Sequence, residues 1–101
     1  MLINLTPHTV NFVDGPAVPP SGTVARVNQT TERFGSVDGV NLVRATFGDV
    51  IGLPFPVDGT IFIVSAMVRA ACTNRDDLAS PGDLVRDAAG AVIGCNSLIV
   101  N

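Results

Sequence analysis

The sequence has no lysine, tryptophan or tyrosine, and it has one histidine and two cysteines among 101 residues. Its six basic residues are all arginines spread along the chain, and its net charge is −3, so duplex nucleic acid is not an expected partner. Because five phenylalanines are the only aromatic residues, a stacking platform for single strands is not expected either. The spacing of Cys72 and Cys95 fits no zinc or thioredoxin motif, which predicts reduced thiols, no metal and no cofactor.

Long hydrophobic runs are also missing. The N-terminus, Met1-Leu-Ile-Asn4, lacks the charged start and long apolar stretch of a secretory signal. The longest apolar run, at 61–72, is interrupted by Ser65 and Arg69 and is shorter than the roughly 20 residues that a membrane span needs. These features predict a cytoplasmic protein without a membrane partner.

No catalytic motif of known spacing occurs. The glycines form neither of the two common phosphate-binding loops, and no G-x-S-x-G surrounds Ser65. Asp76 and Asp77 are adjacent, so their side chains point in different directions on a regular backbone and are poorly placed for joint metal binding. Nucleotide hydrolysis by a standard loop is therefore excluded.

Apolar residues are abundant. Hydrophobic residues make up 47% of the chain and charged residues 15%, where soluble domains have about 25% charged residues. The length predicts a single domain, 1–101, and the surplus of apolar residues predicts a homo-oligomer. A tight monomer with a few exposed valines is the alternative.

The spacing of turn residues is typical of a small β-rich domain. We predict an α+β fold that is mostly β, a small twisted antiparallel sheet or open barrel with one short helix at 65–72 capped by Ser65. Asp38-Gly39 predicts a hairpin between 31–37 and 40–47, and Ala88-Ala-Gly90 a second between 84–87 and 91–95. Other strands are expected at 2–5, 9–13, 22–28, 60–64 and 97–100, with a loop at 15–21 and a type II turn at 80–83.

Two groups of polar residues are candidates for chemistry. His8 follows Pro7, and Asn4 or Thr6 is expected to hold its imidazole, either in a site or as part of the sheet's hydrogen bonding. Acid/base work by His8 needs a nearby carboxylate. The segment 73–77 after the helix has two interpretations: a ligand site, or a cap in which Thr73 and Asp76 begin a helix and Arg75 pairs with one of the two acids.

Several short segments resemble, in the same order, a family of small proteins found in bacteriophages and in actinobacterial and other bacterial genomes. They are Asn4-Leu-Thr-Pro-His8, Pro20-Ser-Gly-Thr-Val-Ala-Arg-Val27, Gly52-Leu-Pro54, Ile63-Val-Ser65 with Val68, Arg75-Asp-Asp77, and Val85-Arg-Asp87 with Ile93-Gly94. The resemblance covers nearly the whole chain but implies no activity. A phage origin implies a virion part, a host-takeover factor or an anti-defence protein.

One class of phage anti-defence protein is similar in role. These compact oligomeric sponges sequester cyclic-nucleotide or ADP-ribose-type immune signals, and they need phosphate-binding arginines and apolar walls for bases, without catalytic groups. We therefore predict a non-catalytic protein that binds a small anionic ligand, with Gly52-Leu-Pro54 as an apolar wall and the arginines converging on one cavity. The expected ligand-binding residues are His8, Arg26, Arg44, Asn74, Arg75, Asp77 and Arg86.

Two other functions stay open. One is a structural or host-takeover module that binds another protein through exposed apolar surface. The other is a small hydrolase that uses His8 with Asp76 or Asp77.

Overall fold

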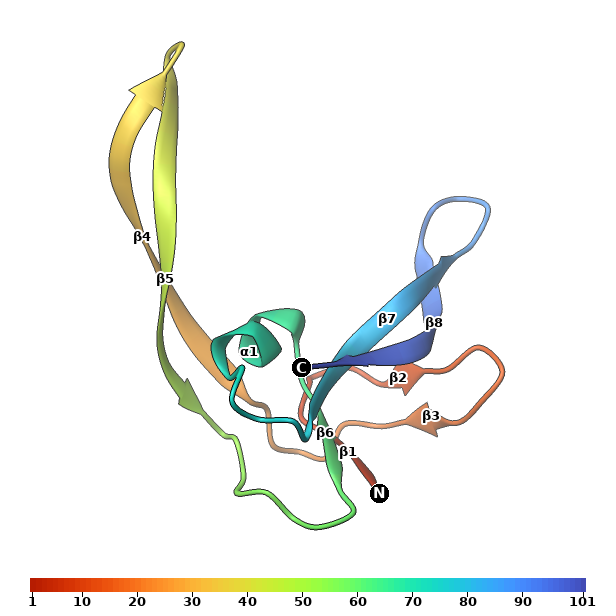
Figure 1. Ribbon diagram of the computed structural model, residues 1–101. Helices are drawn as coiled ribbons and strands as arrows, with labels where there is room; N and C mark the ends of the chain where they lie inside the picture. Colours follow the sequence, from red (N-terminus) through yellow and green to blue (C-terminus); the bar gives the residue numbers. More distant parts are fainter.

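The computed structural model describes residues 1–101 and consists of a small body from which two β-hairpins project (Figure 1). The body is built on a four-stranded sheet in the order β1-β6-β7-β8, and the pairs β2-β3 and β4-β5 each form a two-stranded sheet. The elements are β1 (Leu2–Asn4), β2 (Val10–Asn11), β3 (Ala17–Val18), β4 (Arg26–Val37), β5 (Val40–Ile51), β6 (Ile61–Ile63), α1 (Ala66–Ala71), β7 (Leu78–Arg86) and β8 (Val92–Val100).

This arrangement confirms the prediction of a mostly β fold with one short helix, and the sheets stay open (Figure 1). Antiparallel pairing holds for β7-β8, β2-β3 and β4-β5. In contrast, β6 pairs in parallel with both β1 and β7. Two local predictions were wrong: the loop expected at 15–21 contains β3, and the strand expected at 22–28 begins only at Arg26.

The predicted helix forms where its cap indicated. Ser65 is the N-cap, and its Oγ accepts a hydrogen bond from the backbone N–H of Val68 at 3.2 Å. A helix of six residues is unstable by itself, so tertiary packing must hold it in place. Val68 supplies that packing, because it is buried in the main core with Leu5, Phe62 and Leu78.

The core is small. Only 14 of the 101 residues are buried, most of them in this main cluster or in a second one made by Val10, Ile63 and Cys95. Cys72 and Cys95 are both free thiols, and burial raises the pKa of Cys95. The helix is too short to cross a membrane.

Both predicted hairpins form, with longer strands than expected. The first is the long projection in Figure 1 and turns at Asp38 and Gly39, which both have positive φ. We call this projection, residues Arg26 to Ile51, the β4–β5 arm. The second predicted hairpin consists of β7 and β8 and turns at residues 87–91. The prediction of a type II turn at 80–83 was wrong. Pro81 and Gly82 lie inside β7 and pair with Leu98 and Ser97 of β8.

Candidate functional site

The buried amide of Asn4 fixes the segment that contains His8. Its Nδ2 donates to the backbone carbonyls of His8 at 2.8 Å and Val18 at 3.0 Å. Its Oδ1 accepts from the N–H of Thr6 at 2.9 Å and from the Thr6 hydroxyl at 2.7 Å. Asn4 and Thr6 were expected to hold the imidazole of His8, but they hold its main chain instead. The exposed imidazole makes no hydrogen bond or ion pair within the chain.

The imidazole lines a hollow of about 340 Å³ between the 6–11 segment, the N-cap of α1 and the β7–β8 hairpin. We call it the His8 hollow. Its volume is at the lower end of the range of small-molecule sites. Its lining is Thr6, His8, Thr9, Val10, Asn11, Val64, Ser65, Pro81, Leu84, Val92, Ile93, Gly94 and Cys95. The walls are therefore largely apolar, with one imidazole, several hydroxyls and an amide, and with no carboxylate or guanidinium.

A second hollow of about 290 Å³ also touches Ser65. We call it the Arg26 hollow, and its lining is Ala25, Arg26, Val27, Asn28, Ser65, Met67 and Val68. The side chains of Arg26 and Asn28 are exposed and have no hydrogen-bond or ion-pair partner within the chain. Ser65 is the one residue that lines both hollows.

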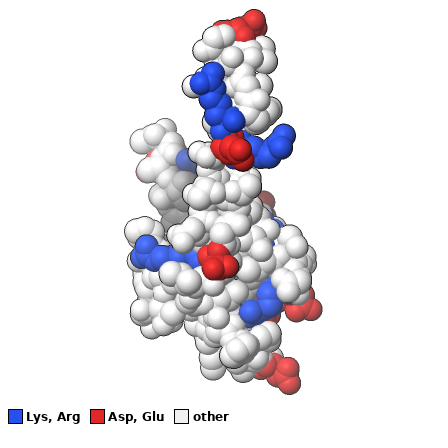
Figure 2. All heavy atoms as spheres, turned by 90° about the vertical axis from the view of Figure 1, so that its left-hand side faces the viewer, with Lys and Arg blue, Asp and Glu red and all other residues white.

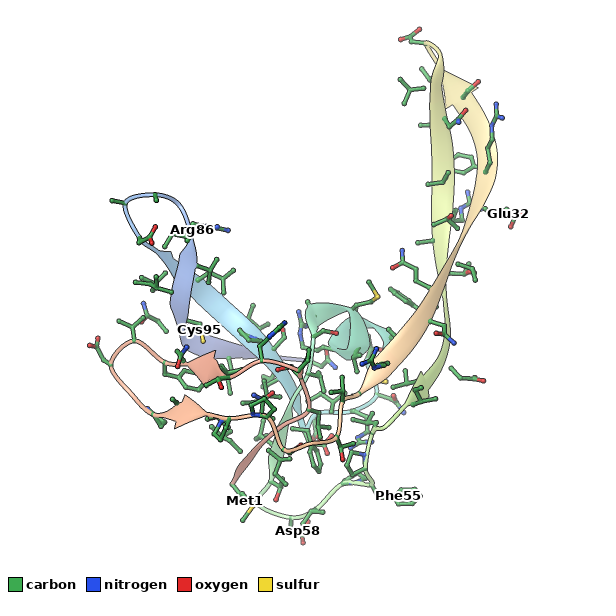
Figure 3. The ribbon with its side chains drawn as sticks, turned by 180° about the vertical axis from the view of Figure 1, so that it is seen from behind. Met1, Glu32, Phe55, Asp58, Arg86 and Cys95 are labelled. Atoms are coloured by element: carbon green, nitrogen blue, oxygen red, sulfur yellow. The ribbon has the colours of Figure 1, made fainter.

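The other predicted arginines do not join Arg26. Arg44 lies on the β4–β5 arm, where its guanidinium carbon is 4.8 Å from the centre of the Phe34 ring. Arg86 lies on the β7–β8 hairpin (Figure 3), and its Nη1 donates to the carbonyl of Gly90 at 3.0 Å. No hollow is lined by more than one arginine, so the expected convergence on one cavity does not occur within a single chain. Asn74 is exposed in the turn after α1 and lines neither hollow.

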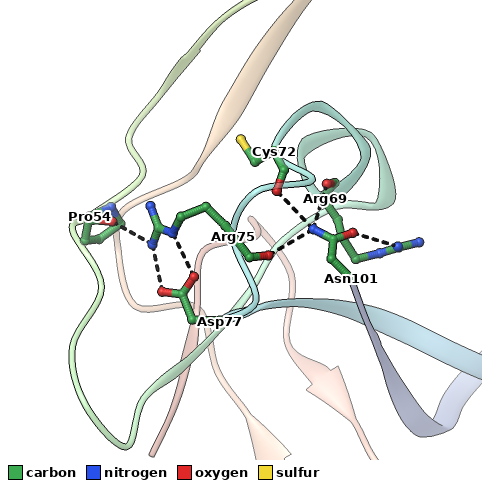
Figure 4. A network of polar contacts seen from close by, with 6 residues as sticks. All are labelled: Pro54, Arg69, Cys72, Arg75, Asp77 and Asn101. Carbon is green, nitrogen blue, oxygen red and sulfur yellow. Dashed lines mark hydrogen bonds and ion pairs between the residues drawn. The ribbon is translucent and has the colours of Figure 1, made fainter.

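Arg75 and Asp77 form a bidentate ion pair (Figure 4). Nε and Nη2 of Arg75 donate to the two carboxylate oxygens at 2.7 and 2.8 Å, and Nη2 also donates to the carbonyl of Pro54 at 3.0 Å. The hydrogen bond and charge of Asp77 raise the pKa of Arg75, and those of Arg75 lower the pKa of Asp77. The pair therefore ties the loop before β6 to the start of β7. The predicted pairing of Arg75 with an acid is confirmed, whereas no helix begins at Thr73.

Asn101 extends this network (Figure 4). Its Nδ2 donates to the carbonyls of Arg69, Cys72 and Arg75 at 3.2, 3.0 and 3.1 Å, and its Oδ1 accepts from Nη1 of Arg69 at 3.3 Å. The two N–H bonds of this amide are thus shared among three carbonyls at the end of α1 and in the turn that follows. The 73–77 segment is accordingly held by internal contacts and is not part of either hollow.

The Arg75–Asp77 pair predicts a specific acid sensitivity. Asp77→Asn is expected to cost about 1–3 kcal/mol at pH 7, because the charge-assisted bonds to Arg75 are lost. The folded pKa of Asp77 lies below its unfolded value of about 3.9, so its contribution is complete above that value and is lost as pH falls through the folded pKa. Urea denaturation between pH 7 and pH 2 measures this pH-dependent stability, and the variant and native curves should converge at the acid end.

The control is Asp76→Asn, because Asp76 is the exposed neighbour and forms no ion pair. Equal behaviour of the two variants would contradict the structural role of Asp77.

The Gly52-Leu-Pro54 segment does not form the apolar wall expected of it. Leu53 packs against the main core, and none of the three residues lines either hollow. Ser65 and Asn28 line the hollows but were not expected as site residues. Asn28 had a sequence signal, since alternation placed it on the same face as Arg26. Ser65 was interpreted only as a cap.

The groups around the hollows differ in how free they are to act on a ligand. The hydroxyl oxygen of Ser65 is occupied by the cap, and burial disfavours the thiolate of Cys95. No group of three or more His, Cys, Asp or Glu side chains is placed to hold a metal ion. Hydrophobic contacts in the His8 hollow and hydrogen bonds from His8, Asn28 and Arg26 are the interactions that this surface offers a ligand.

The chain matches no protein-family model, and comparisons with curated proteins and with solved structures also found no match.

Proposed function

We propose that this chain is a non-catalytic binding protein that sequesters a small anionic ligand and works as a homo-oligomer in the bacterial cytoplasm. The ligand class is a nucleotide signal of the cyclic-nucleotide or ADP-ribose type, and the role is that of a phage-encoded anti-defence sponge. The proposal rests mainly on the two hollows that Ser65 lines in common, one apolar and one with an unpaired guanidinium.

The two hollows match the two halves of such a ligand. A base is flat and apolar on its faces, and Val10, Leu84 and Ile93 are apolar groups of the His8 hollow. A phosphate needs charge-assisted donors, and Arg26 is free to supply them. His8 adds a hydrogen-bonding group in the His8 hollow, and Asn28 adds another in the Arg26 hollow. In this proposal Arg26 and His8 keep the ligand roles expected from the sequence, and Arg75 and Asp77 are structural.

A second candidate is a protein-binding module of the virion or of host takeover. The exposed apolar side chains of the β4–β5 arm favour it, since monomeric proteins rarely expose contiguous apolar surface on an extended element. The hydrolase alternative is not favoured, because Asp77 is bound by Arg75 and no carboxylate lines the His8 hollow.

The presence and identity of a bound ligand are tested by mass spectrometry of the small molecules that the purified protein releases when it is denatured by heat. A nucleotide recovered intact supports sequestration. Recovery of altered products would identify an enzyme, and co-purification with a virion or host protein without a small molecule would favour the second candidate.

The site is tested by calorimetric titration with cyclic dinucleotides, cyclic ADP-ribose and ADP-ribose. Arg26→Ala is expected to weaken binding by roughly 10- to 100-fold, the equivalent of one lost charge-assisted contact. Arg86→Ala removes the same charge from the β7–β8 hairpin and should change the affinity by less than about twofold. If the two variants bind equally well, the Arg26 hollow is not the anion site.

A further inference from the structure

The β4–β5 arm is an isolated two-stranded ribbon. Each strand has 12 residues, which corresponds to a length of about 40 Å, and only the base of the arm packs against the body through Val27 and Val50. Figure 1 shows the rest of the arm projecting away from α1 and the central sheet. A two-stranded hairpin is marginally stable in water without further packing. The arm therefore needs a surface to cover it.

One face of the arm is apolar near its tip. Val37 pairs with Val40, and Leu42 lies on the same face, next to the bulge that contains Phe34. Phe34, Val37 and Val40 are 56%, 56% and 63% exposed. Arg44 stacks on Phe34 from the same side, which places Phe34 on this face as well. We call Phe34, Val37, Val40 and Leu42 the tip cluster.

Charged groups of both signs lie next to the tip cluster. Glu32 is the cross-strand partner of Arg44 in the register, but the two form no ion pair within the chain. Glu32 points away from the ribbon in Figure 3, and Figure 2 shows acidic and basic groups side by side along an otherwise uncharged arm. The arm has three arginines and three acids, so two arms do not repel each other through net charge.

The exposed area of the chain matches the needs of a dimer. The accessible surface is 6629 Å², whereas a compact monomer of 10.4 kDa exposes about 5,400 Å². The excess of about 1,200 Å² exceeds the roughly 800 Å² that each partner buries in a standard interface. The radius of gyration is 16.1 Å, against about 13 Å for a compact domain of this length.

We propose that the arm packs face to face with the arm of a second copy of this chain, tip cluster against tip cluster. In this arrangement we place Arg44 of one copy opposite Glu32 of the other, and the two-fold symmetry repeats that contact with the copies exchanged. This inference specifies the oligomer of the proposed function and does not depend on its ligand. The tests below are done without ligand, so the two proposals fail independently.

The first test is the molar mass of the full-length protein, measured by light scattering and sedimentation over a range of concentrations. The native chain is expected at twice 10.4 kDa, or at a higher even multiple, because the arms associate in pairs. Val40→Asp places a charge in the tip cluster and should raise the dissociation constant roughly 100-fold or more. Val57→Asp is the matched control, since Val57 is an exposed valine in the loop before β6, and it should keep the native mass. A native chain that stays at 10.4 kDa, or a Val40→Asp protein with the native mass, overturns the proposal.

The second test distinguishes arm-on-arm packing from contact with another surface, and does not require Val40→Asp to fold. Glu32→Arg alone places like charges opposite each other and should weaken association by roughly tenfold. Because Glu32 and Arg44 are also register partners within one arm, the restoring change is made on the other copy: a Glu32→Arg chain mixed with an Arg44→Glu chain has opposite charges only between copies, and the mixture should associate within about threefold of the native value. Failure of the mixture to associate better than either variant alone overturns the two-fold packing of the arms.

Discussion

Asn4→Asp is expected to destabilise the protein by about 4 kcal/mol or more at pH 7, a large share of the 5–15 kcal/mol typical of small domains. The substitution keeps the size of the side chain and exchanges the Nδ2 donor for an oxygen. That oxygen would face the carbonyls of His8 and Val18, which now accept from Nδ2 at 2.8 and 3.0 Å. Two carbonyls in partly buried hydrogen bonds then lose the Nδ2 donor, and a negative charge is added beside them.

Urea denaturation at neutral pH measures this effect. Asn41→Asp is the matched control, because Asn41 is exposed on the β4–β5 arm and the same chemical change there should alter stability by less than about 0.5 kcal/mol. The deficit of Asn4→Asp should shrink as the pH falls and the carboxylate is protonated, since burial and the two facing carbonyls disfavour the charged form and raise the pKa of the introduced carboxyl. Equal stability of the two variants would show that the Asn4 amide is not essential to the fold.

The elements that were predicted correctly depend on neighbours in the sequence. Ser65 followed by an apolar run was enough to predict the helix, because capping involves groups three residues apart. Asp38-Gly39 was enough to predict the arm, because its two left-handed residues determine the turn. The length of the arm was underestimated, because the ladder continues toward the body beyond the predicted 31–37 and 40–47. Val27 pairs with Val50, and Thr30 pairs with Thr46 at an Oγ–Oγ distance of 2.6 Å.

The features that were missed depend on distant partners. Parallel pairing of β6 with β1 and β7 joins segments far apart in the chain, and no local pattern specifies it. Pro81-Gly82 has the composition of a turn but lies in β7, where a Cβ on Gly82 would be 2.6 Å from Cγ1 of Ile99. The glycine therefore makes room for a neighbouring side chain and does not mark a turn.

The same distinction applies to the site. The residue types expected of an anion site are present, but Arg44, Arg75 and Arg86 lie on three separate elements, with Arg75 held by Asp77. Composition predicts which functional groups the chain contains, whereas tertiary structure decides which of them lie close together. Only Arg26 and His8 lie in hollows that touch a common residue, Ser65.

Gly52→Ala is expected to destabilise the protein by about 3–5 kcal/mol, for two additive reasons. Gly52 has a φ of +78°, where an alanine costs roughly 1–2 kcal/mol relative to glycine. A Cβ there would also lie 2.4 Å from the carbonyl oxygen of Val24, which is backbone and cannot rotate away. The chain would have to move at the base of the arm, next to the buried Ala25.

Gly59→Ala separates these two causes. Gly59 has nearly the same φ, +75°, but a Cβ there would meet no atom within 4 Å. Its substitution should therefore cost only the backbone term of roughly 1–2 kcal/mol. Thermal and urea unfolding of the two variants, measured side by side, give the difference directly. A Gly52→Ala protein as stable as Gly59→Ala would mean that the close approach of Val24 to Gly52 relaxes without cost, and that the base of the arm is not rigidly seated on the body.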